Sequence, residues 1–209
     1  HRRGHDQGAS SMTPHSLRRV AVVLVAGFLL AGCAANDSLS PQYQNGKETI
    51  SGDYQVAEIP SDSRGEPVVF EGDTEYGDTV SSDDYRGKVL VVNFWYAACG
   101  PCIAEAPLLE EVWKKYQGQG VEFLGVNTYD QAPTAVSFAK DNKISYPSVI
   151  DVVDGNVKFA FAQVAPIQAT PTTLVVDRQG RVAARIVGQL TSASILSTLV
   201  ADALAEDSP

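Results

Sequence analysis

The chain has 209 residues, of which 44% are hydrophobic, and its formal net charge is −9. This hydrophobic share is that of a globular protein and excludes a chain that is disordered throughout. The excess of acidic residues, 25 Asp and Glu against 16 Lys and Arg, argues against nucleic acid as a partner. Once a leader and a polar stretch are set aside, the length leaves room for one ordinary domain.

Residues 1–32 have the layout of a leader or signal peptide. Arg18 and Arg19 precede an apolar run over residues 20–30. The run is shorter than the roughly 20 residues that a membrane-spanning helix needs, which favours a cleaved signal over a permanent transmembrane helix. Because Met12 is the only methionine, the first translated residue is either Met12 or His1.

The leader ends in the sequence Leu-Ala-Gly-Cys, which closes on Cys33. This ending resembles the bacterial lipobox, in which the cysteine is acylated and becomes the new N-terminus. The resemblance implies a lipidation site at Cys33. It also implies a protein that is exported and anchored to the outer face of the cell membrane by that lipid. An ordinary secretory signal with an incidental cysteine is the alternative.

Residues 33–66 are predicted to form a flexible polar tether. They are rich in Ser, Asp, Gln, Asn and Gly and show no sustained apolar period. The folded domain is therefore expected to occupy residues 67–209.

Strands and helices alternate along this predicted domain. Residues 88–94 (KVLVVNF) are a continuous β-branched run, typical of a central strand buried on both faces. Residues 101–117 carry apolar side chains at helical spacing. Such alternation predicts an α/β domain with a central mixed β-sheet flanked by helices. In chain order the predicted elements are strands 68–70 and 79–80 in a hairpin, strand 88–94, helix 101–117, strand 121–127, helix 133–142, strand 146–152, helix 157–164, strands 171–176 and 181–187 in a second hairpin, and helix 192–205.

The sequence Cys99-Gly100-Pro101-Cys102 carries the chemistry. It places two thiols one turn apart at the start of the predicted helix 101–117. Unpaired backbone N–H groups and the helix dipole there favour the thiolate form of Cys99, the attacking form, and Cys102 would resolve the resulting mixed disulfide. A static structural disulfide is the alternative, but a loop of two residues removes little chain entropy and stabilises a fold poorly.

Metal and haem sites find little support in the rest of the chain. The three histidines, at positions 1, 5 and 15, all lie in the leader. A zinc or copper site in the domain would therefore need carboxylates beside two thiolates, a poor match to the preferences of these metals. Ile103 stands where a Cys-x-x-Cys-His haem-attachment motif needs histidine. We expect no metal, and no cofactor other than the redox-active disulfide of Cys99 and Cys102.

Two segments carry a resemblance to a known family. Residues 93–102 (NFWYAACGPC) resemble the active-site segment of thioredoxins, and residues 169–173 (ATPTT) resemble their cis-proline loop. The chain is identified as a member of the thioredoxin superfamily, and it is most similar to the membrane-tethered TlpA/ResA-like branch. Asn93, the Glu-Ala-Pro sequence that begins at Glu105, and the long spacing over residues 131–170 point to that branch. This spacing implies an inserted helix–strand element.

The resemblance also implies roles for residues around the cysteines. Pro171 is expected to be the cis-proline that lies against the pair and helps to receive a substrate chain. Thr170 and Trp95 are placed beside it, as part of the substrate-binding region. Glu105 is expected to face the cysteines and to exchange a proton with Cys102. From spacing alone, a surface glutamate is an equal alternative for Glu105.

The function implied by the resemblance is an extracytoplasmic thiol–disulfide oxidoreductase. We expect a reductant of protein disulfides, as in cytochrome c maturation, that works as a monomer and exchanges electrons with a membrane donor or acceptor. A thiol oxidase or isomerase of the same fold, acting in oxidative folding, is one alternative. A non-catalytic metal-binding or chaperone lipoprotein is the other.

Overall fold

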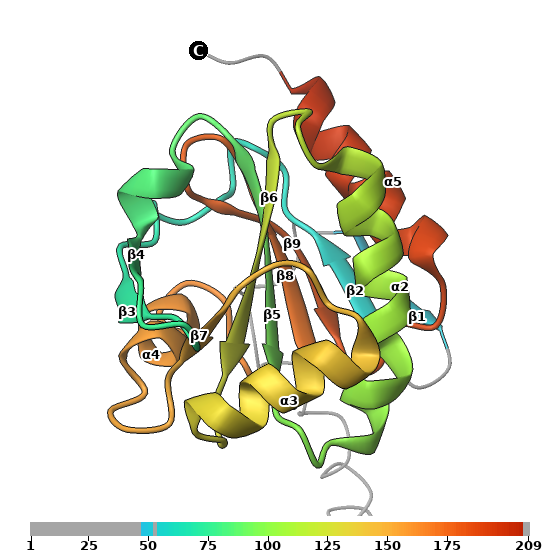
Figure 1. Ribbon diagram of the computed structural model, residues 1–209. Coiled ribbons are helices and arrows are strands. Elements are labelled where there is room, and N and C mark those ends of the chain that lie inside the picture. The colour runs from blue at the N-terminus through green and yellow to red at the C-terminus, as the bar shows by residue number, and fades with distance from the viewer. Residues whose placement is uncertain (1–46, 52–53, 207–209) are drawn as a thin grey trace, which may run out of the picture. The chain divides into compact units, whose positions relative to one another are not determined.

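The computed structural model describes residues 47–51 and 54–206 (Figure 1). Seven strands form one mixed sheet in the order β1-β2-β9-β8-β5-β6-β7, and helices flank it, which confirms the predicted fold class. The elements are β1 (Lys47–Ser51), β2 (Tyr54–Glu58), β3 (Glu71–Asp73), β4 (Thr79–Ser81), the 3-10 helix η1 (Ser82–Tyr85), β5 (Val89–Trp95), α2 (Gly100–Tyr116), β6 (Val121–Asn127), α3 (Ala132–Asn142), β7 (Ser148–Ile150), α4 (Asn156–Ala162), β8 (Thr172–Val176), β9 (Val182–Val187) and α5 (Ala193–Ala205).

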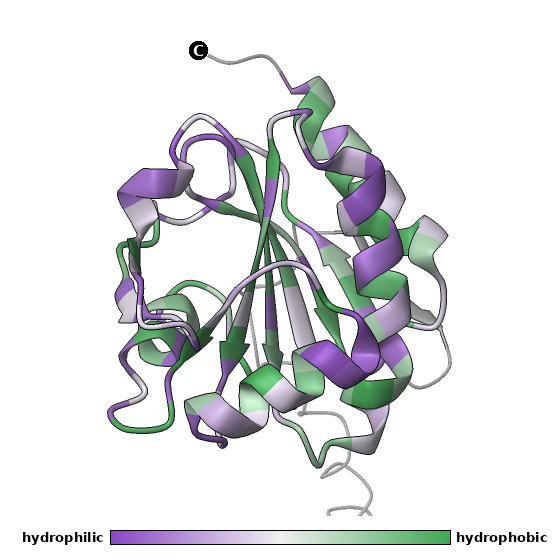
Figure 2. Ribbon diagram, viewed as in Figure 1, coloured by the Kyte–Doolittle hydropathy of each residue, from purple (hydrophilic) through white to green (hydrophobic). Residues whose placement is uncertain are grey.

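Strand β5 is an interior strand of the sheet, between β8 and β6, and all seven of its residues are buried. It pairs in parallel with β6 and antiparallel with β8. Val89 and Val91 pack into the core on the side of α2 and α5, whereas Leu90 and Val92 pack on the side of α4. Figure 2 shows the apolar colouring concentrated on these central strands. The burial of both faces explains the continuous apolar run, and the strand ends immediately before the cysteine segment.

The prediction that residues 33–66 are a tether is wrong for their described part. Strand β2 pairs antiparallel with β9, and β1 pairs with β2, so both belong to the main sheet. Val56 packs against the core formed with α2 and α5, and the Ile59 amide donates to the Ala183 carbonyl at 2.7 Å. The apolar signal was missed because β2 is short and its apolar pair Val56 and Ala57 lies between the polar residues Gln55 and Glu58. The leader and Cys33 lie outside the described residues.

The predicted entrance hairpin forms, with one strand displaced. Strands β3 and β4 pair antiparallel, but β3 begins at Glu71 and not at Val68. Val68 and Phe70 instead bury their side chains in the core on the α4 side, without ladder pairing. The second predicted hairpin forms between β8 and β9. Among residues 47–51 and 54–206, no helix is long and apolar enough to cross a membrane.

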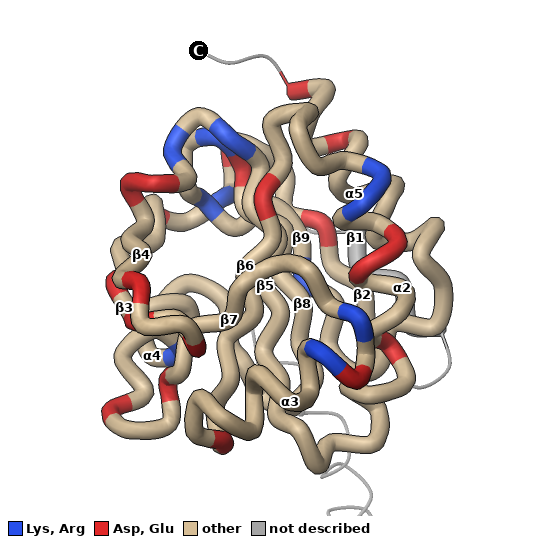
Figure 3. The backbone as a smooth tube through the Cα atoms, in the orientation of Figure 1, with Lys and Arg blue, Asp and Glu red and all other residues tan. Residues whose placement is uncertain are grey.

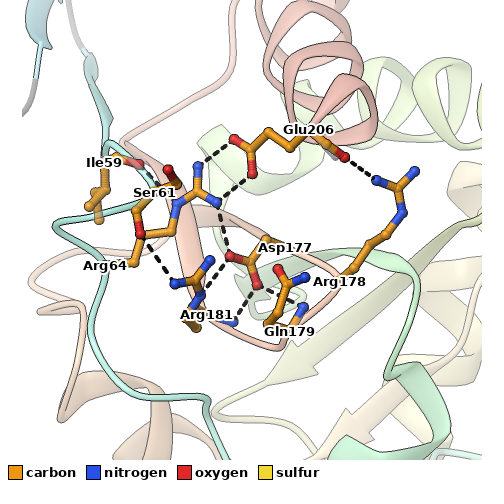
Figure 4. A network of polar contacts seen from close by, with 8 residues as sticks. All are labelled: Ile59, Ser61, Arg64, Asp177, Arg178, Gln179, Arg181 and Glu206. Atoms are coloured by element: carbon orange, nitrogen blue, oxygen red, sulfur yellow. Dashed lines mark hydrogen bonds and ion pairs between the residues drawn. The ribbon is translucent and has the colours of Figure 1, made fainter. Parts of the chain in front are cut away.

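Figure 4 shows a network of charged side chains around the buried pair Arg64 and Asp177. Asp177 follows β8, which runs antiparallel to β5 and therefore ends away from Cys99. Its carboxylate accepts from Arg64 Nη1 at 2.9 Å and from Arg181 Nε at 3.0 Å. Arg64 also pairs with Glu206, just beyond α5. The network thus ties the segment after β2, the β8–β9 turn and the end of α5 together.

Candidate active site

Cys99 and Cys102 form a disulfide at the start of α2, with their Cα atoms 5.2 Å apart. Cys99 is the N-cap residue of the helix, and its Sγ accepts a hydrogen bond from the Cys102 amide at 3.2 Å. Gly100 and Pro101 form the first turn, where the missing N–H of proline has no consequence because that position lacks a helical partner. The predicted placement of both cysteines at a helix N-terminus is therefore what the structure shows.

The two sulfurs lie against a wall of apolar side chains. Cys99 and Cys102 are each only 3% exposed and pack with Trp95 and Ala135. The Trp95 ring contacts Phe138, with centroids 4.3 Å apart. This wall shields the inner side of the disulfide from water.

Trp95 is held from behind and is not a surface residue. It is 6% exposed, and its Nε1 donates to Ser148 Oγ at 3.2 Å. A Cβ atom on Gly125 would lie 2.8 Å from Trp95 Nε1 and 2.1 Å from Ser148 Oγ, so glycine is required for this close approach. Substrate binding by Trp95 stays a prediction, and its buried ring agrees with a residue that packs beside the cysteines. Its observed contacts make it a packing residue behind the disulfide.

The loop before β8 brings the predicted proline to the disulfide. The Thr170–Pro171 peptide bond is cis, as the resemblance implies. The Thr170 carbonyl oxygen lies 3.9 Å from Cys99 Sγ. Pro171 is buried, and its carbonyl accepts from the Gly188 amide at 2.9 Å. Cys99 and the Thr170–Pro171 segment, far apart in the sequence, are therefore neighbours in the fold.

Glu105 is completely buried, which excludes the alternative of a surface glutamate. Its Oε1 accepts from Asn93 Nδ2 at 2.8 Å, and its Oε2 accepts from the Leu190 amide at 2.7 Å. Desolvation raises the pKa of Glu105 to about 7, and the two hydrogen bonds oppose this shift. Glu105 lies one helical turn beyond Cys102. A carboxyl that titrates near neutrality at this position is suited to proton exchange with a thiol.

Asn93 links Glu105 to the sheet. Its Nδ2 also donates at 3.1 Å to Oγ1 of Thr173, which is its register partner on β8. From the sequence alone, Asn93 is only a point of resemblance to one branch of the family. Its hydrogen bonds show that it orients the buried carboxyl of Glu105.

A second polar link at the site was not found from the sequence. The Ala97 amide, two residues before Cys99, donates to Asp130 Oδ2 at 2.6 Å. Asp130 lies in the loop after β6, where Asn127 Oδ1 accepts from the amides of Tyr129 and Asp130. An Asn followed three residues later by Asp directly after a buried strand is a signal for such a turn. The contact of Asp130 with the cysteine segment, however, can be seen only in the folded structure.

The described side chains do not offer a metal site. Among residues 47–51 and 54–206, no group of three or more His, Cys, Asp or Glu side chains could hold a metal ion.

Comparison with protein families identifies a matching family. The model of the AhpC/TSA family matches residues 65–185, which is more than half of the chain.

Curated relatives include thiol-disulfide oxidoreductases named ResA. The ResA of Geobacillus thermodenitrificans is 39% identical over 112 residues, which are 54% of this chain and 62% of that protein. The ResA of Bacillus subtilis is 31% identical over 119 residues, which are 57% of this chain and 64% of that protein. The matched segment thus spans somewhat less than two thirds of these relatives.

Solved structures with the same fold include two proteins about 30% identical to the chain. A DsbF homologue from Corynebacterium diphtheriae superposes with a TM-score of 0.62 at 31% identity, covering 70% of this chain and 92% of that one. A thiol:disulfide interchange protein of the thioredoxin family from Chlorobium tepidum gives a TM-score of 0.62 at 30% identity, covering 68% and 97%. A secreted thiol-disulfide isomerase from Corynebacterium glutamicum gives 0.63 at 26% identity, covering 77% and 99%.

Proposed function

The chain belongs to the AhpC/TSA family, and from this premise we propose that it is a thiol–disulfide oxidoreductase whose working pair is Cys99 and Cys102. One observation carries the proposal: the pair forms a disulfide at the N-terminus of α2, where the Cys102 amide donates to Cys99 Sγ. In the reduced protein the same amide and the helix dipole stabilise a thiolate on Cys99. The names of the ResA relatives agree with this activity.

The reaction proceeds by two successive exchanges. The Cys99 thiolate attacks one sulfur of a substrate disulfide, forms a bond to it and releases the other substrate sulfur as a thiolate, which takes up a proton. The Cys102 thiolate then attacks Cys99 Sγ, and the first substrate sulfur leaves. Two electrons pass to the substrate, and the protein ends with the Cys99–Cys102 disulfide. The reverse sequence oxidises a substrate dithiol with the same atoms.

Glu105 serves as the proton acceptor for Cys102 in the second exchange. Cys102 is buried, so its thiol has little access to a base in solution. Glu105 follows on the same helix, and its raised pKa of about 7 allows it both to accept and to return a proton near neutral pH. Asn93 and the Leu190 amide hold the carboxyl in place during both states.

The substrates are protein disulfides outside the cytoplasm, and the direction is reduction. The ResA relatives and the secreted Corynebacterium glutamicum protein support this setting. Gly-Pro between the cysteines is the dipeptide of thioredoxin, whose reduction potential of about −270 mV favours a reductant. Pro171 and Thr170 border the sulfur that a substrate would meet. A lipid on Cys33 would hold the protein, as a monomer, near a membrane partner that restores the dithiol.

Two competing roles make different demands on the same residues. An oxidase or isomerase of oxidative folding would use the same pair at a higher potential, near −120 mV for a strong oxidant. A metal-binding lipoprotein would bind metal without turning over disulfides.

The test is disulfide turnover by the reduced full-length chain, with insulin as the substrate and dithiothreitol as the electron source. We expect turnover by the wild type, none by Cys99→Ser, and a trapped mixed disulfide with Cys102→Ser. Cys33→Ser is the matched control, a cysteine substitution outside the pair that should leave turnover unchanged. Full turnover by Cys99→Ser would refute the proposal. The equilibrium potential against glutathione then separates reduction, near −270 mV, from oxidation, near −120 mV.

A further inference from the structure

We infer that Asp130 is a positioning residue for the reactive cysteine: its carboxylate fixes the turn that precedes Cys99 and so keeps Cys99 at the N-cap of α2. The inference rests on the proposed function, because it concerns the reactivity of the same sulfur. Asp130 lies outside the Cys-x-x-Cys segment, in the loop that follows β6.

The turn before Cys99 depends on few bonds. After β5 ends at Trp95, the Cys99 amide donates to the Tyr96 carbonyl at 3.2 Å, which closes the turn. The amide inside that turn, of Ala97, points outward and is bonded to Asp130 Oδ2 at 2.6 Å. This short, charge-assisted bond joins the turn to the loop after β6, beside the contact of the Tyr96 and Tyr129 rings, whose centroids lie 5.7 Å apart. Without it, the Ala97 amide would need water or another acceptor.

Asp130 is itself held firmly. Asn127 at the end of β6 is completely buried, and its Nδ2 donates to Asp130 Oδ2 at 3.0 Å. Its Oδ1 accepts from the Asp130 amide at 2.7 Å. Trp95 and Asn127 are register partners on the parallel strands β5 and β6, so both loops leave the sheet side by side. The Asp130 carboxylate therefore connects the turn before Cys99 to the end of a buried strand.

Few charged residues border the disulfide. Four loops surround it: residues 96–99, which contain Cys99, residues 128–131 and 163–171, which are hydrogen-bonded to them, and residues 188–192, which are hydrogen-bonded to Pro171. Asp130 is the only Asp, Glu, Lys or Arg in these loops. Figure 3 shows the loop between β5 and α2 without a charged residue. The other charged groups nearby are Glu105 inside the fold, Arg185 on β9, whose Nη1 lies 3.4 Å from the Pro166 carbonyl, and two carboxylates in residues 151–155, Asp151 and Asp154. The Asp151 amide donates to the Asn127 carbonyl at 2.9 Å.

Positioning and charge have opposite effects on the thiolate of reduced Cys99. A negative charge near the sulfur disfavours a second negative charge, so removal of the Asp130 charge alone makes the thiolate more favourable. Loss of the hydrogen bond releases the turn and weakens the alignment of Cys99 Sγ with the Cys102 amide, which makes the thiolate less favourable. A variant that keeps the acceptor without the charge therefore separates the two effects.

The experiment compares Asp130→Ala with Asp130→Asn in full-length chains that also carry Cys33→Ser and Cys102→Ser, so that Cys99 is the only thiol. The probe is the rate of alkylation by iodoacetamide from pH 5 to 9. The Asn side chain can still accept from the Ala97 amide, whereas Ala cannot. We expect Asp130→Ala to lower the rate at pH 7 about threefold or more and Asp130→Asn to keep or raise it, since the rate follows the thiolate fraction.

The matched control is Asp84, which also accepts from a backbone amide in a turn. Its Oδ2 lies 2.7 Å from the Ser81 nitrogen, in the exposed segment at η1. Asp84→Ala should leave the alkylation profile of Cys99 unchanged. Urea unfolding of each variant shows that the rates are compared among folded proteins.

Each other outcome overturns the inference. Equal acceleration by Asp130→Ala and Asp130→Asn would show an effect of charge alone, and an unchanged profile in both would show no role in the reactivity of Cys99. Insulin turnover by the wild type, measured in parallel, tests the proposed function separately. Absence of turnover with an Asp130-dependent alkylation rate would refute the proposed function and leave the positioning role standing.

Discussion

Asn93 Nδ2 donates to Glu105 Oε1 at 2.8 Å, on a carboxyl that is completely buried. This pair joins the central strand to the helix that carries the cysteines. It also places an ionisable group in the interior, and burial raises the pKa of Glu105 to about 7. The stability of the domain should therefore depend on pH in a direction that the structure fixes.

The first prediction concerns this pH dependence. The pKa of Glu105 is about 7 in the folded state, against the ordinary value of 4.5 that applies to the unfolded chain. Between these values the folded state binds more protons than the unfolded state, so the free energy of unfolding should fall as pH rises from 4.5 to 7. The contribution is about 3 kcal/mol, from 1.36 kcal/mol per pKa unit. This stabilising contribution is fully present below pH 4.5, the pKa of the carboxyl in the unfolded chain, and it is lost as the pH rises above about 7, its pKa in the folded state.

Urea unfolding of the oxidised protein at several pH values between 4 and 8 measures this slope. Burial also raises the pKa of Glu75 and Asp151, and these groups add to the slope with the same sign. The comparison with Glu105→Gln isolates the contribution of Glu105, because the substitution removes one titration. Glu105→Gln should also unfold more easily at pH 4.5, since its amide cannot accept from both Asn93 and Leu190. An identical slope in both proteins would contradict the prediction.

Removal of the Asn93 side chain should raise the pKa of Glu105 further. The hydrogen bond from Asn93 favours the ionised carboxyl, so Asn93→Ala takes away a contribution that lowers the pKa. Titration of the Glu105 carboxyl by carbon-13 NMR measures the change. Thr173→Val is the control, because it removes the other partner of Asn93 and leaves the bond to Glu105. A pKa that falls in Asn93→Ala would reverse the assigned role.

Arg64 is predicted to be a major contributor to stability. Its side chain is 4% exposed and pairs with Asp177, which is 1% exposed. Arg64→Met leaves buried acceptors without this partner, and we expect a loss of about 3 kcal/mol in the free energy of unfolding. Lys114→Met removes an exposed ion pair to Glu110 within α2 and should cost less than about 0.5 kcal/mol.

The effect of Arg64→Met should be confined to stability. The network lies at the end of the sheet away from Cys99, so disulfide turnover per folded molecule should match that of the wild type. Equal urea midpoints for Arg64→Met and Lys114→Met would show that the network contributes little.

A methyl group at Gly125 should disturb the wall behind the disulfide. The added Cβ would meet Ser148 Oγ at 2.1 Å and Trp95 Nε1 at 2.8 Å, distances that force these groups to move. We expect Gly125→Ala to lower the free energy of unfolding by about 2 kcal/mol, the range for overpacking. Gly65→Ala, whose Cβ would meet no atom closer than 3.4 Å, is the control. A wild-type midpoint with unchanged tryptophan fluorescence for Gly125→Ala would contradict this account.

The sequence predicted most elements of the fold, because their signals are local. The buried run of β5, the helical spacing of α2 and the turn between β8 and β9 each lie within one segment. Strand β2 was missed because its membership in the sheet depends on pairing with β9, more than 120 positions along the chain. A short polar strand has no local signal that separates it from a linker.

The candidate site divides in the same way. The cysteines form a motif within four residues, so their chemistry and their place on α2 were predictable. The resemblance to a known family supplied Pro171. The burial of Glu105 was not predictable from spacing, since one of its partners, Leu190, is 85 residues away. Asp130 was missed for the same reason, because its partner, Ala97, lies on another loop.

The near absence of charge on the loops around the disulfide has a consequence for encounters with other molecules. A polypeptide that approaches through these loops meets one carboxylate, Asp130, although the chain as a whole is acidic; a fifth loop at this end, residues 151–155, carries two more. The loops that border the disulfide directly therefore provide little long-range steering of their own. At this surface, partners are therefore distinguished by shape and apolar contacts, which act only after the two molecules have collided.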